Sequence, residues 1–316
     1  RELLDIIHVI INSVMLAVTL IVVTVPEGLP MSVTISLAMS MRKMLKEKNL
    51  VRKLHACETM GATTVICTDK TGTLTYNKMS VVEQEFIDVD MDFVALSISI
   101  NSTAELSDDE SGKLRAIGNP TEGALLLWLQ ELGYDYRALR ERLVIISQEP
   151  FSTESKRMTT VAKDKLTGRS VRYIKGAPEI VLEMSDHIAG NRTKGEILSH
   201  LQSYQSKGMR TLGFAYQEMD VEEGPVIFAG IVGIADPVRV DVREAIDICR
   251  NNAGVRVIMI TGDVALTANE ISRQSGIMDA QEPMQILTGA EFALMSDEEI
   301  KTNVIPTLKV LSRARP

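Results

Sequence analysis

Asp69 is the residue of this sequence best placed to do chemistry. It follows a stretch, Thr64 to Thr68, that predicts a β-strand, and it opens the heptapeptide Asp-Lys-Thr-Gly-Thr-Leu-Thr. A second predicted strand, Arg256 to Ile260, ends in the same manner at Thr261-Gly262-Asp263. Ligands of open α/β sheets bind at the carboxyl ends of the strands, so we expect these two segments to meet at one site.

The residue types at this predicted edge suit phosphoryl transfer. A carboxylate such as that of Asp69 can attack a phosphoryl group as a nucleophile. Positive charge and donors that can neutralise the phosphoryl oxygens come from Lys70, Thr71, Thr73, Thr261 and Gly262. Phosphoryl transfer depends mainly on positioning and charge neutralisation, which implies a Mg²⁺ ion bridging Asp69 and the phosphate.

The apolar beginning of the chain predicts a transmembrane helix. Ile6 to Val25 carries no full charge, and about 20 such residues are needed to cross the hydrocarbon core. The alternative is a buried helix of a soluble protein. A second apolar run, Met31 to Met41, leads into six basic residues between 42 and 53, the loading expected on the cytoplasmic side of a membrane. We therefore expect the rest of the chain to be cytosolic.

Between these runs, Pro26-Glu27-Gly28-Leu29-Pro30 is expected to interrupt the helix, because each proline removes a backbone donor and the glycine adds freedom. Unwound backbone at membrane depth occurs only where it is buried in protein or lines a cavity. Free carbonyls beside the Glu27 carboxylate would form the ligand set of a hard cation. A surface loop between short helices is the alternative interpretation.

Composition limits the remaining possibilities. The chain has 316 residues, 45% of them hydrophobic, which is enough for a sizeable core and two or three domains. A net charge of −8 argues against a nucleic-acid partner, which would be bound through clustered Lys and Arg. The three cysteines are far apart and predict neither a zinc site nor a disulfide framework. The start on Arg1 and the polar end at Pro316 suggest a fragment.

The order of predicted elements indicates an α/β protein whose sheet is interrupted. Strand patterns at Val226 to Ile234, Arg256 to Ile260, Gln285 to Leu287 and Lys309 to Leu311 alternate with helical patterns. We interpret these as a doubly wound sheet whose first strand is separated from the rest by an inserted domain. The expected divisions are 1–55 for the membrane helix and stalk, 56–81 and 224–316 for the sheet domain, and 82–223 for the insertion.

The heptapeptide at Asp69 matches the phosphorylation signature of the P-type ATPases, and the chain resembles that family along essentially its whole length. The Pro-Glu-Gly-Leu-Pro break, Lys175-Gly176-Ala177, Asp236-Pro237 and Thr261-Gly262-Asp263 occur in the family's order. The resemblance implies a haloacid-dehalogenase-like phosphorylation domain with an inserted α+β nucleotide-binding domain. Soluble phosphatases of that superfamily are the nearest alternative, but they carry a second Asp where this chain has Thr71, which favours a lasting aspartyl phosphate.

The resemblance also implies how ATP is held, since the chain has no P-loop motif. Phe151 matches the residue that stacks on adenine, and Glu122 matches an acid beside it. Glu122 has an alternative role in a helix cap with Asn119 and Pro120. The other positions that match nucleotide or magnesium contacts are Lys70, Thr71, Lys156, Lys175, Gly176, Arg210, Asp236, Arg239, Asp263 and Arg313. Thr153 departs from the basic residue of many relatives.

Within the family, the stretch from Asn49 to Met60 is most similar to plasma-membrane-type calcium pumps, so Ca²⁺ export from the cytosol is the favoured function. The resemblance implies Ca²⁺ ligands at Glu27 and at the carbonyls of Val22, Val23 and Val25. Mn²⁺ or Na⁺/K⁺ transport is an alternative. A further alternative is a fragment that binds nucleotide without turnover, because further membrane helices, the actuator domain and later magnesium ligands would lie outside this chain.

Overall fold

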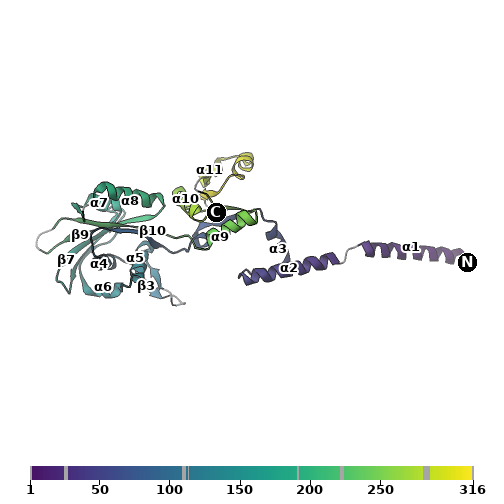
Figure 1. Ribbon diagram of the computed structural model, residues 1–316, viewed down its shortest axis with the longest axis horizontal. Coiled ribbons are helices and arrows are strands. Elements are labelled where there is room, and N and C mark those ends of the chain that lie inside the picture. Colours follow the sequence, from purple (N-terminus) through teal and green to yellow (C-terminus); the bar gives the residue numbers. More distant parts are fainter. Residues whose placement is uncertain are drawn as a thin grey trace. The chain divides into compact units, whose positions relative to one another are not determined.

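The computed structural model describes residues 2–24, 28–108, 112, 114–190, 192–220, 224–279 and 285–314 (Figure 1). The chain divides into two compact units, 1–64 and 65–316. Each unit is described by itself.

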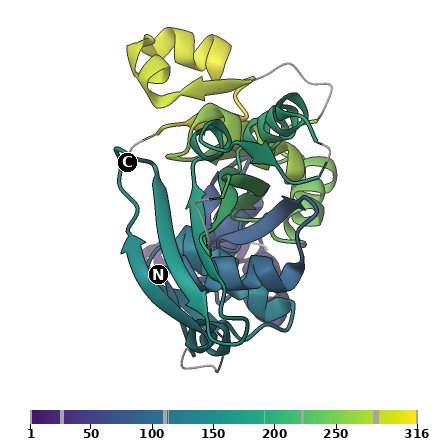
Figure 2. The same ribbon diagram turned by 90° about the vertical axis from the view of Figure 1, so that its left-hand side faces the viewer.

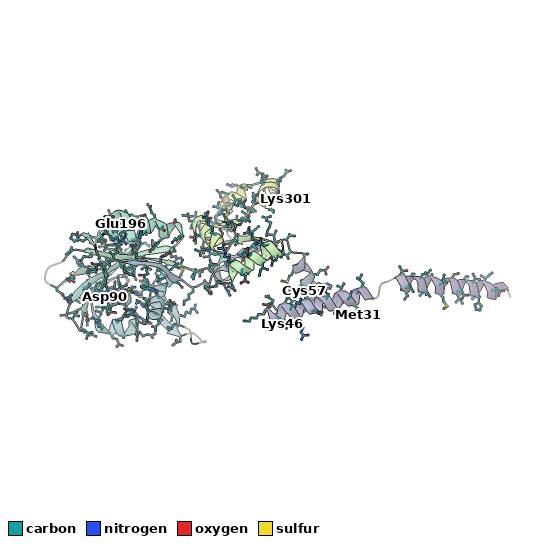
Figure 3. All side chains as sticks on the ribbon, in the orientation of Figure 1. Met31, Lys46, Cys57, Asp90, Glu196 and Lys301 are labelled. Atoms are coloured by element: carbon teal, nitrogen blue, oxygen red, sulfur yellow. The ribbon has the colours of Figure 1, made fainter. Side chains whose placement is uncertain are left out.

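The first unit consists of helices α1 (Glu2–Thr24), α2 (Gly28–Lys46) and α3 (Leu54–Gly61). The apolar side chains of α1 project outward on all sides (Figure 3). Its threonines satisfy their hydroxyls locally, since Thr19 Oγ1 donates to the Met15 carbonyl at 2.8 Å. The helical stretch that begins at Asp5 is long and apolar enough to cross a membrane, by length and composition.

The structure describes only part of the segment in which the helix is expected to be interrupted. Helix α1 ends at Thr24 and α2 begins at Gly28, while residues 25–27, with Val25, Pro26 and Glu27, lie outside the described residues. The prediction that the chain is unwound as far as Pro30 is wrong, because Gly28, Leu29 and Pro30 form the first turn of α2. A proline fits there, since the first backbone N–H groups of a helix have no intrahelical partner.

The second unit contains a parallel sheet of four strands in the order β1-β11-β13-β12. The strands are β1 (Val65–Asp69), β11 (Arg256–Ile260), β12 (Ile286–Thr288) and β13 (Val310–Ser312), close to the predicted positions. Helical segments connect them: α9 (Val242–Asp247), η2 (Ile248–Asn252), α10 (Ala265–Gln274), α11 (Gly289–Leu294), α12 (Asp297–Glu299) and η3 (Ile300–Val304). Met259 and Val310 of the sheet pack against Ala268 of α10 in a buried core. The predicted parallel α/β sheet is therefore present.

The same unit contains an antiparallel sheet in the order β2-β10-β9-β7-β6-β5, with β8 beside β10. Its strands are β2 (Ser80–Phe86), β5 (Leu143–Glu149), β6 (Arg157–Asp164), β7 (Ser170–Gly176), β8 (His187–Ile188), β9 (Arg210–Glu218) and β10 (Ile227–Ala235). Helices α4 (Met91–Ile100), α5 (Pro120–Glu131) and α6 (Tyr136–Arg142) cover one face, and α7 (Pro178–Glu183) and α8 (Lys194–Ser206) cover the other (Figures 1 and 2). A hairpin of β3 (Glu105–Asp108) and β4 (Leu114–Ile117) adjoins α5.

Strand β10 corrects one expectation. The strand predicted over Val226 to Ile234 exists, but it pairs antiparallel with β2 and β9, so its assignment to the parallel sheet is wrong. Ile231 packs against α7 and α8, while Val232 packs against α4 and α5. A strand buried on both faces has a nearly continuous apolar sequence in either kind of sheet. The antiparallel sheet therefore runs from Ser80 to Ala235, beyond both expected limits of the insertion.

Candidate functional site

Asp69 ends β1 at the carboxyl edge of the parallel sheet, where its side chain is exposed. Its Oδ1 accepts a hydrogen bond from the backbone N–H of Lys70 at 2.7 Å. In the parallel register Asp69 lies opposite Ile260, so the segment after β11 begins beside it. The Lys70 ammonium is buried and lies 2.6 Å from Oδ2 of Asp263. The two segments expected to meet therefore do meet, and they meet through Lys70.

The turn after Lys70 depends on glycine. Gly72 has a φ of 75°, in the left-handed region that residues with a Cβ rarely adopt. It turns the chain between Thr71 and Thr73, both of which are exposed. The Thr71 hydroxyl and the Asp69 carboxylate are hard oxygen donors, the type that Mg²⁺ prefers. These residues fit the predicted ion in donor type.

The segment after β11 is fixed mainly through its backbone. Thr261 is buried, and its Oγ1 accepts from the N–H of Asp263 at 3.1 Å. The N–H of Arg313 donates to the Asp263 carbonyl at 2.9 Å, and the N–H of Ala314 donates to the Thr261 carbonyl at 3.0 Å. Arg313 thus supports this edge with its backbone, while its side chain is exposed.

A cleft of about 390 Å³ opens beside Lys70. Its lining includes five of the predicted site residues: Lys70, Arg210, Asp236, Gly262 and Asp263. Gly208 lines it as well, and a Cβ on this residue would lie 2.7 Å from the Cα of Thr267. Only glycine permits this approach of the β9 end to α10. The cleft thus joins residues of both sheets around one space beside Lys70, the residue that follows the candidate nucleophile.

Asp236 lines the cleft and also makes structural hydrogen bonds. Its Oδ2 accepts from the Thr75 hydroxyl at 2.5 Å, and its Oδ1 accepts from the N–H of Lys78 at 3.1 Å. Thr75 is fully buried and also contacts the Lys70 carbonyl. The two oxygens of Asp236 thus join the segment after β10 to the segment between β1 and β2, and these are the two connections between the sheets. Sequence reasoning missed Thr75 and Lys78, although Thr75 closes the heptapeptide and was available as a signal.

Arg239 belongs to the same connection. Its N–H donates to the Leu74 carbonyl at 2.9 Å, and its guanidinium lies 5.9 Å from the ring centroid of Tyr76. A cation over an aromatic face is a favourable contact. The contacts of Arg239 therefore fasten the connection next to Asp236.

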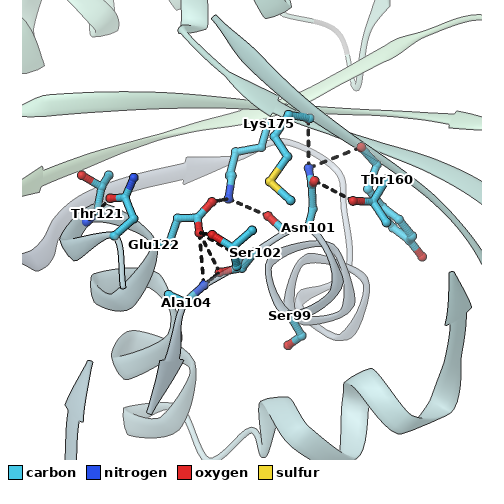
Figure 4. Close-up of polar contacts among 12 residues, drawn as sticks. Ser99, Asn101, Ser102, Ala104, Thr121, Glu122, Thr160 and Lys175 are labelled. Atoms are coloured by element: carbon cyan, nitrogen blue, oxygen red, sulfur yellow. Dashed lines mark hydrogen bonds and ion pairs between the residues drawn. The ribbon is translucent and has the colours of Figure 1, made fainter. Parts of the chain in front are cut away.

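Lys175 and Glu122 form a buried ion pair under the antiparallel sheet (Figure 4). Lys175 Nζ lies 2.7 Å from Glu122 Oε1 and donates to the Asn101 carbonyl at 2.5 Å. Glu122 Oε2 accepts from the N–H and the hydroxyl of Thr103, each at 2.8 Å. Neither residue lines the cleft beside Lys70. No pattern in the sequence indicated the partners Asn101 and Thr103.

The charge state of this pair follows from its surroundings. Burial opposes ionisation of Glu122, but the Lys175 ammonium and the hydrogen bonds from Lys175 and Thr103 outweigh it and hold the pKa of Glu122 below its ordinary value. Burial lowers the pKa of Lys175, and Glu122 opposes that shift. The predicted helix cap is present, since Asn119 accepts from the Thr121 N–H at 2.9 Å and Pro120 lies in the first turn of α5. The Glu122 side chain itself bonds to Lys175 and Thr103.

The remaining predicted nucleotide contacts lie around the ends of β6 and β7. Phe151 is 57% exposed between β5 and β6, so its ring is available to a ligand. The Lys156 carbonyl accepts from the Ala177 N–H at 2.9 Å. A Cβ on Gly176 would lie 2.5 Å from that carbonyl, so glycine is required there. Lys156 and Gly176 are thus brought together, and Lys175 pairs across the strands with Met158.

The predicted Ca²⁺ ligands are only partly visible. Val22 and Val23 lie on the exposed surface of α1, while Val25 and Glu27 fall outside the described residues. In the part of the chain that the structure describes, no three His, Cys, Asp or Glu side chains gather as a metal site. The calcium site stays a prediction.

Comparison with known proteins gives the class. Residues 90–241 match the family model for the P-type ATPase cytoplasmic domain N. It is similar to "Calcium-transporting ATPase PAT1" of Dictyostelium discoideum, with 40% identity over 97% of this chain and 30% of the relative. It is 39% identical to "Calcium-transporting ATPase 3, plasma membrane-type" of Oryza sativa subsp. japonica, over 97% of this chain and 33% of the relative. The chain spans about a third of the length of these curated relatives.

Proposed function

We propose that this chain is the part of an ATP-driven cation pump that accepts the γ-phosphoryl group of ATP on Asp69. The observation that carries the proposal is the exposed Asp69 carboxylate beside the Lys70 and Asp263 pair, at the edge of a cleft that also holds Arg210. A carboxylate nucleophile next to a fixed positive charge is the arrangement that phosphoryl transfer requires.

The transfer has a simple balance of atoms. A carboxylate oxygen of Asp69 bonds to the γ-phosphorus, the bond from that phosphorus to the β,γ-bridging oxygen breaks, and ADP leaves with the electron pair. Lys70 offsets the negative charge that gathers on the phosphoryl oxygens, and Asp263 fixes the position of Lys70. Mg²⁺, held by Asp69 and Thr71, would supply further charge neutralisation.

The aspartyl phosphate of this proposal is an intermediate that lasts. The chain resembles the haloacid-dehalogenase-like superfamily, whose phosphatases carry a second carboxylate at the position of Thr71. A threonine cannot serve as the general base that activates water for rapid hydrolysis, because its hydroxyl does not ionise near neutral pH. We also propose that the domain carrying Asp69 has the haloacid-dehalogenase-like fold that the resemblance implies.

Calcium is the proposed cargo. The match to the P-type ATPase family model and the names of the relatives support it, as does the apolar helix α1. In this proposal Glu27 and the carbonyls of Val22, Val23 and Val25 supply part of the ion site. The nucleotide is held through Phe151, Lys156 and Arg210, and the unit beginning at Val65 is cytosolic.

The test uses the full-length protein in membranes, incubated with γ-labelled ATP and Mg²⁺, with and without Ca²⁺. We expect an acid-stable, hydroxylamine-sensitive label that depends on Ca²⁺ and falls below detection in Asp69→Asn. Asp69 is exposed, so this variant should fold normally, and its thermal unfolding serves as the control. Label that persists in Asp69→Asn would refute the nucleophile. Label that forms equally without Ca²⁺ would refute the cargo alone.

A further inference from the structure

A second pocket, of about 450 Å³, lies in the antiparallel-sheet region. Helix α4 forms one side of it, and β7 and β9 form the other. It shares no described lining residue with the cleft beside Lys70, and it contains no predicted nucleotide contact. The proposed function therefore leaves this pocket unexplained.

Tyr173 gives the pocket a polar floor. This residue lines the pocket although it is only 2% exposed, and its hydroxyl has no hydrogen-bond partner among the described residues. Beside it, the Arg142 guanidinium forms two hydrogen bonds with Asp164, at 3.0 and 2.5 Å. The Tyr173 hydroxyl is thus free to donate a hydrogen bond to a ligand in the pocket.

The wall of the pocket is aromatic. The ring of Phe93 lies 5.5 Å from that of Tyr173 and 4.9 Å from that of Tyr216, centroid to centroid. Because all three residues line the pocket, a ligand would meet ring surfaces along one side. Aromatic faces attract apolar groups and also cations.

The rim of the pocket is acidic. The charged lining residues are five acids and two arginines, a formal charge of −3: Asp88, Asp90, Asp92, Asp164, Glu218, Arg142 and Arg169. Asp90 caps α4 and Asp92 accepts from the Tyr134 hydroxyl at 2.8 Å (Asp90 is labelled in Figure 3). Asp88 and Glu218 are exposed and have no side-chain partner within the described ranges. Both carboxylates act on Tyr216, whose pKa is raised chiefly by burial and further by their charges.

We propose that this pocket binds an organic amine, in which a cationic nitrogen is carried on an aromatic or apolar body. The body lies against Phe93 and Tyr216, the cation is held by Asp88 and Glu218, and the Tyr173 hydroxyl donates to an oxygen at the far end of the ligand. An anion is disfavoured by the rim. The arginine side chain of a polypeptide offers the same cation and is the alternative source of the ligand.

Calorimetric titration of the full-length protein in detergent tests this inference. The probes are tyramine, which has the amine, the ring and the hydroxyl; phenethylamine, which lacks the hydroxyl; 4-ethylphenol, which lacks the amine; and acetyl-arginine amide. We expect tyramine to bind at least about 10-fold more tightly than 4-ethylphenol, the loss expected for one charged contact. Tighter binding of acetyl-arginine amide than of tyramine would assign the pocket to a polypeptide side chain.

Variants locate the binding. Asp88→Asn with Glu218→Gln should weaken the binding of either cation about 10-fold or more, whereas Glu131→Gln, an exposed acid of α5 outside the pocket, should leave it unchanged. Tyr173→Phe keeps the ring and should remove most of the advantage of tyramine over phenethylamine. The inference is overturned if neither cation binds at millimolar concentration, or if 4-ethylphenol binds as tightly as tyramine. Equal binding by the rim variant would overturn it as well.

Discussion

Two lysine–carboxylate pairs with nearly equal N···O distances differ in how accessible they are to a ligand. Lys70 and Asp263 are 2.6 Å apart at the edge of a cleft, and the Asp263 side chain is 35% exposed. Lys175 and Glu122 are 2.7 Å apart, but the Glu122 side chain is only 9% exposed and is surrounded by protein donors. The first pair can exchange partners with a ligand, and the second can do so only if the protein opens. Accessibility, more than residue type, distinguishes a site from a structural element.

The largest effect is expected where the buried pair is broken. Lys175→Met leaves the Glu122 carboxylate without its cation in the protein interior, so the free energy of unfolding should fall by about 3–5 kcal/mol. Denaturant unfolding of the chain, followed by tryptophan fluorescence, measures it. Combining the change with Glu122→Gln should recover a large part of the loss. A fall of under about 1 kcal/mol would show that the pair opens to water, as the Lys70 pair can.

Breaking the accessible pair should affect the reaction more than the fold. Lys70→Met removes the charge beside the phosphoryl group, so phosphorylation by ATP should slow about 10²–10³-fold. The Asp263 side chain is 35% exposed and lines the cleft, so the loss of stability should stay below that of Lys175→Met. Rapid-quench labelling measures the rate. Lys301→Met, an exposed lysine of the same unit (Figure 3), is the control and should be neutral. An unchanged rate in Lys70→Met would remove this residue from the proposed mechanism.

A smaller effect is expected at the connection between the sheets. Thr75→Val deletes the buried hydroxyl that donates to Asp236, and leaving this acceptor unsatisfied should cost about 1–3 kcal/mol of stability. Thr75→Ser keeps the hydroxyl and is the matched control. Thermal unfolding of both variants gives the comparison. If Asp236 serves the nucleotide instead of the connection, Thr75→Val should leave stability intact and raise the KM for ATP.

The sequence predicted that the segments carrying Lys70 and Asp263 meet, but it predicted neither of the two ion pairs. Asp69 and Asp263 follow strands whose patterns are clear, and the parallel pairing of adjacent strands brings their carboxyl ends together. Glu122 and Lys175 are separated by 53 positions and meet through tertiary packing, which no local pattern encodes. Strand β10 was predicted as a strand but given the wrong sheet, because burial on both faces hides the pairing direction. Glu27 lies outside the described residues, so its role as a Ca²⁺ ligand stays a prediction.

The smallest effect is expected for a third ion pair, Arg142 and Asp164, when the pH is lowered. Hydrogen bonds from Arg142 hold the pKa of Asp164 well below its ordinary value, against the opposing effect of burial. A carboxylate whose pKa is depressed by folding stabilises the native state above its unfolded pKa, near 4, and loses this contribution as pH falls toward the folded value. Stability should therefore fall by about 1–2 kcal/mol more between about pH 4 and pH 2 in the parent chain than in Asp164→Asn. Denaturant unfolding across this range measures the difference. Asp297→Asn, which changes an exposed acid, is the control and should keep the parent's change of stability with pH. If Asp164→Asn also keeps it, water screens the Arg142 pair as it screens ion pairs on an open surface.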